Sequence, residues 1–390
     1  MPPDTALPFS VHHPLGTTAS QIAVINKPMD LVCGTTLPFH SLVFETYGIL
    51  NKARNNAVLI CHALSGDHHA AGIDKDGKVG WWDHYIGPDK AIDTNKYFVI
   101  CPNNIGSCCG STGPTATDPE TGKPYGKNFP SIQVRDWVES QKYLMDHLKI
   151  DCWAAVIGGS LGGMQAMCWS LAYPEKLQHA VVIAAAMKLS AQNIAFNEIA
   201  RRAIQSDAEF KDGHYLDYQT SPKQGLALAR MIGHLTYLSD DALGRKFGRL
   251  VNSDGLGTAE KELGEFEVAN YLNYQGDKFS QQFDANSYIL ITKMLDHFDL
   301  AQDYNNDPTE AFSQAKCQFL VISFSSDWRF SPLCSRQITD SLIGAGKAVS
   351  YIRIESDQGH DAFLLPDTRY QNALGIYLSR AASELEANSL

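Results

Sequence analysis

The chain has 390 residues, of which 44% are hydrophobic and 19% are charged. This composition is typical of a globular protein with a substantial core. The formal net charge of −11 disfavours nucleic acid or an anionic membrane surface as the main partner, because either would require a large basic surface. Residues 1–16 lack the basic and apolar regions of a signal peptide, and no apolar stretch approaches about 18 residues. We therefore expect a cytoplasmic protein.

Short apolar runs alternate with helical patterns along most of the chain. Residues 21–32 and 42–46 are expected to form a leading antiparallel pair. The runs that follow are apolar throughout, which is typical of strands covered on both faces in a mostly parallel sheet. They span residues 57–61, 97–101, 153–157, 179–185, 318–324 and 349–354. The pattern predicts an α/β fold with helices on both faces of the sheet.

The strand pattern stops between residues 188 and 306. Helix-like segments replace it, for example at residues 191–203, 225–238 and 283–297. We predict that residues 188–306 form a helical lid, inserted into a catalytic domain of residues 1–187 and 307–390. Because no proline-rich or low-complexity linker is present, this lid is expected to pack on the sheet domain.

The sequence Gly158-Gly159-Ser160-Leu161-Gly162 lies between a predicted strand and the helix-like residues 163–171. A G-x-S-x-G turn at this place is typical of a nucleophile elbow, in which the serine hydroxyl is exposed at a sharp bend before a helix N-terminus. The same five-residue pattern also occurs in ordinary glycine-rich loops. The rest of the site must therefore decide between the two interpretations.

A serine nucleophile requires a base and an acid that orients the base. Asp327 directly follows the predicted strand 318–324, and His360 follows the next one. The order Ser160, Asp327, His360 is that of an α/β-hydrolase fold. A histidine near a strand end is weak evidence by itself, because the sequence contains thirteen histidines. The three residues together, each after its own strand, predict a catalytic triad.

The anion that forms during acyl transfer requires two backbone N–H donors. Leu161, which follows the nucleophile, is expected to supply one donor. Leu64, in the loop at residues 61–66 after an earlier strand, is the candidate for the other.

The same loop carries a cluster of histidines that suggests a metal site. His62, Asp67, His68 and His69 are close in sequence, but no distant set of ligands accompanies them. We therefore expect no metal. The nine cysteines form no C-x-x-C pair, and most are expected to be buried apolar residues, with the vicinal pair Cys108-Cys109 as the one candidate for reactivity.

In the predicted lid, Arg230, His234 and Tyr237 form a polar stripe on an otherwise apolar helical segment. One interpretation is a solvated helix face. The other is that Arg230 binds a substrate carboxylate, because a guanidinium pairs with a carboxylate through two hydrogen bonds.

Several sequence blocks accompany these candidate residues. They are HALSG at 62–66, GWWD at 80–83, GSTGP at 110–114, GKPYG at 122–126, GGSLGGMQ at 158–165 and DWRFSP at 327–332. Together, these blocks closely resemble the homoserine O-acyltransferases of the α/β-hydrolase fold, and the resemblance extends from about residue 39 to residue 364. Several of the blocks are absent from general esterases.

The resemblance implies transfer of an acyl group from acyl-coenzyme A to the side-chain hydroxyl of L-homoserine, through an acyl-serine, in methionine biosynthesis. It implies no cofactor, because acyl-coenzyme A is a co-substrate, and it implies a homodimer formed through the lid helices. It also assigns Arg230, Tyr237 and Asp361 to homoserine binding. Asp361 follows from the resemblance alone.

In this family, the second position after the triad aspartate separates acetyl from succinyl donors. Here it is Arg329, which would pair with the free carboxylate of a succinyl group. An acetyl group would leave the guanidinium unpaired, a difference on the order of 1 to 3 kcal/mol, or roughly 10- to 100-fold. The resemblance is therefore to the homoserine O-succinyltransferases, with succinyl-coenzyme A as donor. If Arg329 instead faces solvent or pairs with a structural carboxylate, acetyl-coenzyme A would be the donor.

Three further functions are compatible with the triad. L-serine as acceptor differs from homoserine by one methylene, which a pocket distinguishes only weakly. A plain esterase would use water, but the GSTGP and GKPYG blocks and Arg230 disfavour it. An inactive interaction protein would usually have lost a triad residue, and all three are present.

Overall fold

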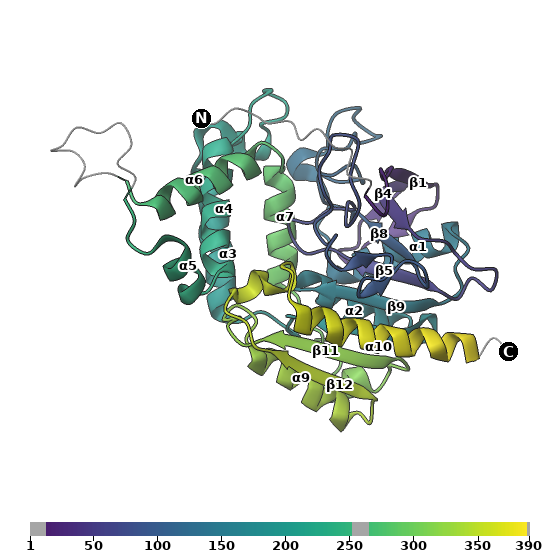
Figure 1. Cartoon of the computed structure of the whole chain (residues 1–390). Coiled ribbons are helices and arrows are strands. Elements are labelled where there is room, and N and C mark those ends of the chain that lie inside the picture. The colour runs from purple at the N-terminus through teal and green to yellow at the C-terminus, as the bar shows by residue number, and fades with distance from the viewer. Residues whose placement is uncertain (1–12, 252–264, 388–390) are drawn as a thin grey trace.

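The structure, a computed structural model, describes residues 13–251 and 265–387 (Figure 1). The predicted catalytic domain extends beyond these ranges at residues 1–12 and 388–390, and the predicted lid does so at residues 252–264. The division at residues 188 and 306 stays a prediction.

An eight-stranded sheet forms the centre of the fold, in the order β1-β4-β8-β5-β9-β10-β11-β12. The antiparallel pairs are β1–β4 and β4–β8, and the other neighbours are parallel. The strands are β1 (Gln21–Ile25), β4 (His40–Tyr47), β5 (Ala57–Cys61), β8 (Phe98–Pro102), β9 (Trp153–Gly159), β10 (Leu177–Ile183), β11 (Gln318–Phe324) and β12 (Val349–Ile354). Two small sheets pair β2 (Met29–Asp30) with β3 (Thr36–Leu37) and β6 (Ile86–Gly87) with β7 (Ile92–Asp93).

The predicted strands agree closely with the observed ones, and the differences lie at their ends. The leading antiparallel pair is confirmed, although the predicted strand 21–32 is divided into β1 and β2. Strand β10 ends at Ile183 rather than at residue 185, because Ala184 has a positive φ of 46° that extended backbone does not allow.

Two cores cover the two faces of the sheet. Alternate residues of a strand point to opposite faces, so Leu59 lies in one core while Val58 and Ile60 lie in the other. The first core contains α1 (Val134–His147), α2 (Leu161–Ala172) and α9 (Pro332–Gly344), and the second contains α10 (Thr368–Ala387), which runs along the sheet in Figure 1. The predicted α/β fold is thereby confirmed.

Helices, as predicted, take the place of strands in the described part of the segment between β10 and β11. In Figure 1 the longer ones lie together beside the sheet. They are α3 (Ala191–Ser206), α4 (Lys223–Tyr237), α5 (Asp240–Phe247), α6 (Glu267–Ser280), α7 (Ala285–Asp296) and α8 (Pro308–Phe312). Short 3₁₀ helices occur at η1 (Gly126–Asn128), η2 (Pro174–Lys176), η3 (Ala208–Gly213) and η5 (Gly359–Phe363).

The end of α4 contacts the loops that follow β11 and β12. Trp328 Nε1 donates a hydrogen bond to Leu238 O at 3.0 Å, and Ser239 Oγ donates to Asp357 O. A side chain at Gly359 would collide with backbone atoms of Tyr237 and Ser239. These contacts fix α4 against the two loops that carry Asp327 and His360. No helix within the described ranges is long and apolar enough to cross a membrane.

Candidate active site

Ser160 lies at the bend between β9 and α2, with a strained backbone conformation of φ 58° and ψ −123°. Such conformations persist only where the surrounding structure enforces them. Here a Cβ at Gly158 would collide with the Gly162 backbone, and a Cβ at Gly162 would collide with Cys61 O. Only glycine at both positions allows the bend. The geometry is therefore that of a nucleophile elbow.

The structure brings Ser160, His360 and Asp327 together at the carboxyl ends of β9, β12 and β11. His360 Nε2 lies 2.9 Å from Ser160 Oγ, and His360 Nδ1 lies 2.7 Å from Asp327 Oδ2. The Asp327 carboxylate is buried, and its Oδ1 accepts hydrogen bonds from the N–H groups of Arg329 and Phe330 at 3.0 and 2.9 Å. A carboxylate held in this way fixes the Nδ1–H tautomer of His360, which leaves Nε2 as the acceptor of a hydrogen bond from the Ser160 hydroxyl.

Leu64 and Leu161 line the same cavity as Ser160. Leu161 is the first residue of the 12-residue helix α2, where backbone N–H groups point out of the helix. Among the described loops, turns and caps, neither the Leu64 nor the Leu161 amide donates a backbone hydrogen bond. Both sequence candidates for the oxyanion donors are thus placed beside the serine.

Arg230 is half-buried on α4, and its guanidinium lies 4.8 Å from the centre of the Phe279 ring and 6.0 Å from that of Tyr237. Its Nη1 donates to Ser65 Oγ at 3.2 Å, but its buried Nε has no partner. No carboxylate of the described chain lies within 4.0 Å of this guanidinium. Arg230 therefore keeps donor capacity for an anion beside the cavity that Tyr237 lines.

The solvated-face interpretation of the polar stripe is wrong for His234. This side chain is buried against the edge of Tyr271, and neither ring nitrogen has a hydrogen-bond partner. Burial lowers the pKa of His234 to about 3, and the nearby charge of Arg230 acts in the same direction. The imidazole is therefore neutral.

Asp361 follows His360 in η5 and lines the cavity. Burial raises the pKa of its carboxyl, an effect that His360 and Arg230 partly oppose. A cation bound nearby would favour the ionised form. The structure thus places Asp361, which only the family resemblance had assigned, in the lining of this cavity.

Arg329 also lines the cavity, and only 8% of it is exposed. Its Nη1 donates to Thr236 Oγ1 at 2.7 Å and its Nη2 to Asn197 Oδ1 at 3.4 Å, while the guanidinium lies 5.2 Å from the centre of the Tyr237 ring. All three partners are neutral. The interpretation that Arg329 faces solvent is therefore wrong.

A neighbouring arginine shows how this fold satisfies a purely structural guanidinium. Arg201 is equally buried, and it forms ion pairs with Asp296 at 2.7 Å and with Glu198 at 3.0 Å. Arg329 has no such carboxylate within 4.0 Å in the part of the chain that the structure describes. Its charge is available to a group that enters the cavity.

The histidine cluster forms protein contacts and no metal site. His69 Nδ1 lies 3.0 Å from Glu45 Oε2, and its Nε2 lies 2.9 Å from Lys78 O. Because both partners are acceptors, His69 is protonated, and Glu45 raises its pKa despite the opposing effect of burial. Within residues 13–251 and 265–387, no group of three or more potential ligands could hold a metal ion.

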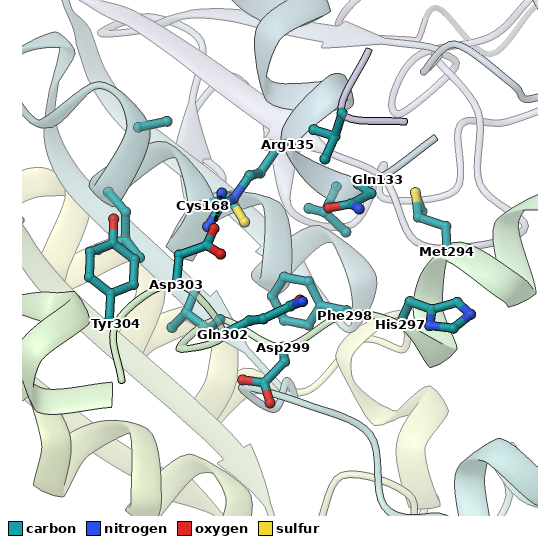
Figure 2. Close-up of a pocket in the computed structure, with 15 residues that line it drawn as sticks. Gln133, Arg135, Cys168, Met294, His297, Phe298, Asp299, Gln302, Asp303 and Tyr304 are labelled. Carbon is teal, nitrogen blue, oxygen red and sulfur yellow. Dashed lines mark ion pairs between the residues drawn. The ribbon is translucent and has the colours of Figure 1, made fainter. Parts of the chain in front are cut away.

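A second cavity, of about 260 Å³, lies between α1, α2 and the segment after α7 (Figure 2). None of the predicted site residues lines it. Its Arg135 and Asp303 point toward each other and form an ion pair, as Figure 2 shows.

The cysteines are all free, and Cys108 Sγ accepts a hydrogen bond from Asp284 N at 3.4 Å.

Comparison with known proteins agrees with this geometry. Residues 56–366 match the α/β-hydrolase fold family. The homoserine O-succinyltransferase of Cellvibrio japonicus is 59% identical over 367 residues, which cover 94% of this chain and 97% of that protein. The homoserine O-succinyltransferase of Pseudomonas syringae pv. tomato is 55% identical over 95% of this chain and 98% of its own length.

Solved structures lead to the same fold. The homoserine O-acetyltransferase of Bacillus anthracis superimposes with a TM-score of 0.84 at 28% identity, covering 93% of this chain and 98% of that one. Esterase E22 superimposes with a TM-score of 0.83 at 27% identity, covering 93% of this chain and 100% of its own. With relatives above 50% identity over nearly the whole length, the chain belongs to the α/β-hydrolase fold family and, within it, to the homoserine O-succinyltransferases.

Proposed function

We propose that this chain transfers a succinyl group from succinyl-coenzyme A to the side-chain hydroxyl of L-homoserine. The names of its relatives support the reaction, and one observation on this chain carries the choice of donor. That observation is the buried Arg329 guanidinium, which lines the Ser160 cavity and pairs with no carboxylate of the described chain.

In the first half-reaction, His360 Nε2 accepts the proton of Ser160 as Oγ attacks the thioester carbonyl. The N–H groups of Leu64 and Leu161 stabilise the negative charge on the carbonyl oxygen. The carbon–sulfur bond then breaks, and coenzyme A leaves as a thiol with the proton from His360. The product of this step is a succinyl-serine.

In the second half-reaction, His360 accepts the proton of the homoserine hydroxyl, whose oxygen attacks the succinyl-serine carbonyl. The Ser160 Oγ–carbonyl bond breaks, and the serine recovers the proton from His360. Arg230 binds the homoserine carboxylate, Tyr237 packs against the bound amino acid, and Asp361 pairs with its ammonium group. Holding the hydroxyl close to the ester favours it over water.

The choice of donor depends on what satisfies Arg329. A succinyl carboxylate supplies a charge-assisted hydrogen-bond partner, whereas an acetyl group leaves the guanidinium with neutral hydrogen-bond partners only. The site therefore favours succinyl-coenzyme A.

We further propose that the enzyme acts in the cytoplasm, in methionine biosynthesis, as a homodimer. In support of a dimer, Leu228 and Leu235 lie seven residues apart on α4 and are 47% and 51% exposed. These two positions lie on one face of the helix.

The proposed function is tested by measuring thiol release from succinyl- and acetyl-coenzyme A, each with L-homoserine, with L-serine or without an acceptor. We expect sustained thiol release only with succinyl-coenzyme A and homoserine, release of at most one equivalent per active site without an acceptor, and no release with Ser160→Ala. Preference for acetyl-coenzyme A would identify an acetyltransferase, and preference for L-serine would identify a serine acyltransferase. Equally fast release over many turnovers without an acceptor would identify a hydrolase.

A further inference from the structure

A fully buried polar network includes side chains of α2, the helix that begins directly after Ser160. It joins His62, Asn104, Gln141, Gln165 and Trp169, which come from the loop after β5, the loop after β8, α1 and α2. Burying this many polar groups stabilises a fold only if each is hydrogen bonded. The triad does not include any of them.

The Trp169 indole determines which group donates and which accepts in each of these hydrogen bonds. The Trp169 indole is a donor only, and its Nε1 donates to Gln141 Oε1 at 2.7 Å. Gln141 Nε2 must then be the donor to Asn104 Oδ1 and to Gln165 Oε1, both at 2.7 Å. Because Gln165 Oε1 accepts from Gln141, Gln165 Nε2 points away from Gln141, toward the carbonyls of His62 and Leu161.

Gln165 Nε2 uses its two hydrogens on two backbone carbonyls. It donates to His62 O at 3.0 Å and to Leu161 O at 3.3 Å. His62 immediately precedes the segment that ends in Leu64, and Leu161 follows the nucleophile. One side-chain amide thus connects the two backbone segments that carry the proposed oxyanion donors.

His62 holds the same loop from its ring. Its Nε2 accepts hydrogen bonds from Asn104 N and Nδ2, both at 3.1 Å, so the ring hydrogen is on Nδ1, which lies 2.8 Å from Ala63 O. Burial lowers the pKa of His62, which keeps the ring neutral. The ring therefore orients the peptide next to Leu64.

We propose that Gln165 is the positioning residue of the oxyanion hole: it sets the spacing between the Leu64 and Leu161 amides and does not itself contact the substrate. This inference rests on the proposed acyl-serine chemistry. Because both half-reactions pass through a tetrahedral anion at the same two amides, a loss of their spacing slows both steps equally.

Three variants test this proposal. Gln165→Leu removes both donated hydrogen bonds, whereas Gln165→Glu keeps the shape and, while protonated, can still donate one. Met167→Ala is the matched control, because Met167 is fully buried on the same helix and contacts neither carbonyl through a hydrogen bond. Single-turnover rates of acylation and transfer, the KM for homoserine and thermal unfolding are measured for all four proteins.

We expect Gln165→Leu to lower both single-turnover rate constants by roughly 10- to 100-fold, somewhat less than deletion of an oxyanion donor, with little change in KM. Gln165→Glu should lose activity as pH rises through the pKa of the new carboxyl, across a range in which the wild type is unchanged. Met167→Ala should lower the unfolding temperature while keeping both rate constants near those of the wild type.

Binding of a small alkylboronic acid supplies a readout independent of the acyl donor. The boronate adduct on Ser160 places an oxygen in the oxyanion hole, so its affinity should fall with Gln165→Leu by a factor similar to the rate constants. Even if the enzyme uses a different acyl donor, the affinity of the boronic acid would still show whether Gln165 positions the oxyanion hole. The proposal is overturned if Gln165→Leu binds the boronic acid like the wild type, or if the rates of Gln165→Leu and Met167→Ala fall in equal proportion.

Discussion

Replacement of Arg329 by leucine tests the basis of donor choice. The guanidinium lies in the cavity with two hydrogen bonds to neutral side chains and no ion pair within the described chain. A succinyl carboxylate would add a hydrogen-bonded charged partner, worth about 1.5–3 kcal/mol. Its loss corresponds to a decrease of roughly 10- to 150-fold in kcat/KM for succinyl-coenzyme A.

The same change should act differently on acetyl-coenzyme A. The acetyl group makes no contact that needs the charge, and deleting the guanidinium removes the cost of burying it unpaired. We therefore expect kcat/KM for acetyl-coenzyme A to be unchanged or higher. Steady-state rates of both donors are measured at saturating homoserine, with thermal unfolding to verify that Arg329→Leu is folded.

Thr236→Val is the matched control for this experiment. It removes the hydroxyl that accepts from Arg329 Nη1 at 2.7 Å but retains the charge. The preference for succinyl-coenzyme A should then be weaker than in the wild type but stronger than in Arg329→Leu. If Arg329→Leu slows both donors alike, or if the wild type prefers acetyl-coenzyme A, Arg329 has a structural role and our assignment of the donor is wrong.

Three further predictions concern the mechanism and the fold. The acyl-serine predicts ping-pong kinetics, so double-reciprocal plots should be parallel, and intersecting lines would contradict it. Arg230→Ala should slow transfer to homoserine far more than acylation of Ser160 in single-turnover experiments, and equal losses would exclude Arg230 from the acceptor site. The Glu45–His69 pair should raise the unfolding temperature of the wild type above that of Glu45→Gln, mainly between pH 4.5 and 6.5. A difference in unfolding temperature that does not depend on pH would refute this.

The sign of the last effect follows from the two pKa shifts. The pKa of His69 is raised from 6.5, so its contribution is complete below that pH and is lost as pH rises through the folded-state pKa. The pKa of Glu45 is lowered from 4.5 by His69 and Tyr47 against the effect of burial, so its contribution is lost as pH falls through its own folded-state value. Both groups are buried, so solvent screens the pair little.

The meeting of Ser160, Asp327 and His360 at one edge of the sheet was predictable because each residue has a local signal. Ser160 requires glycines at fixed positions around a strained bend, and Asp327 and His360 each directly follow an apolar strand. In a parallel sheet, the carboxyl ends of the strands lie at one edge, so three separate local patterns converge there without knowledge of the loops. Chain order then predicts a role for each residue.

Asp361 and His234 had no such signal. A carboxylate after His360 is indistinguishable in sequence from a solvated loop residue, and its place in the cavity depends on the 3₁₀ turn η5. His234 has the same helical spacing as Arg230 and Tyr237, yet α6 covers it, because Tyr271 packs against its ring. Helical periodicity gives the face of a residue but not the element that packs against that face.

The same limit explains why Gln165 was visible only in the structure. In sequence it is a polar residue one turn into an apolar helix, a position that usually indicates solvent or strain. In the structure, the loops after β5 and β8 and helix α1 cover Gln165. Its Oε1 accepts a hydrogen bond from Gln141, and its Nε2 donates to Leu161 O and His62 O. The two hydrogen bonds to backbone carbonyls connect Gln165 to both segments that carry the proposed oxyanion donors. If spacing of the oxyanion donors is the reason, apolar replacement costs catalysis, whereas if packing is the reason, it costs only stability.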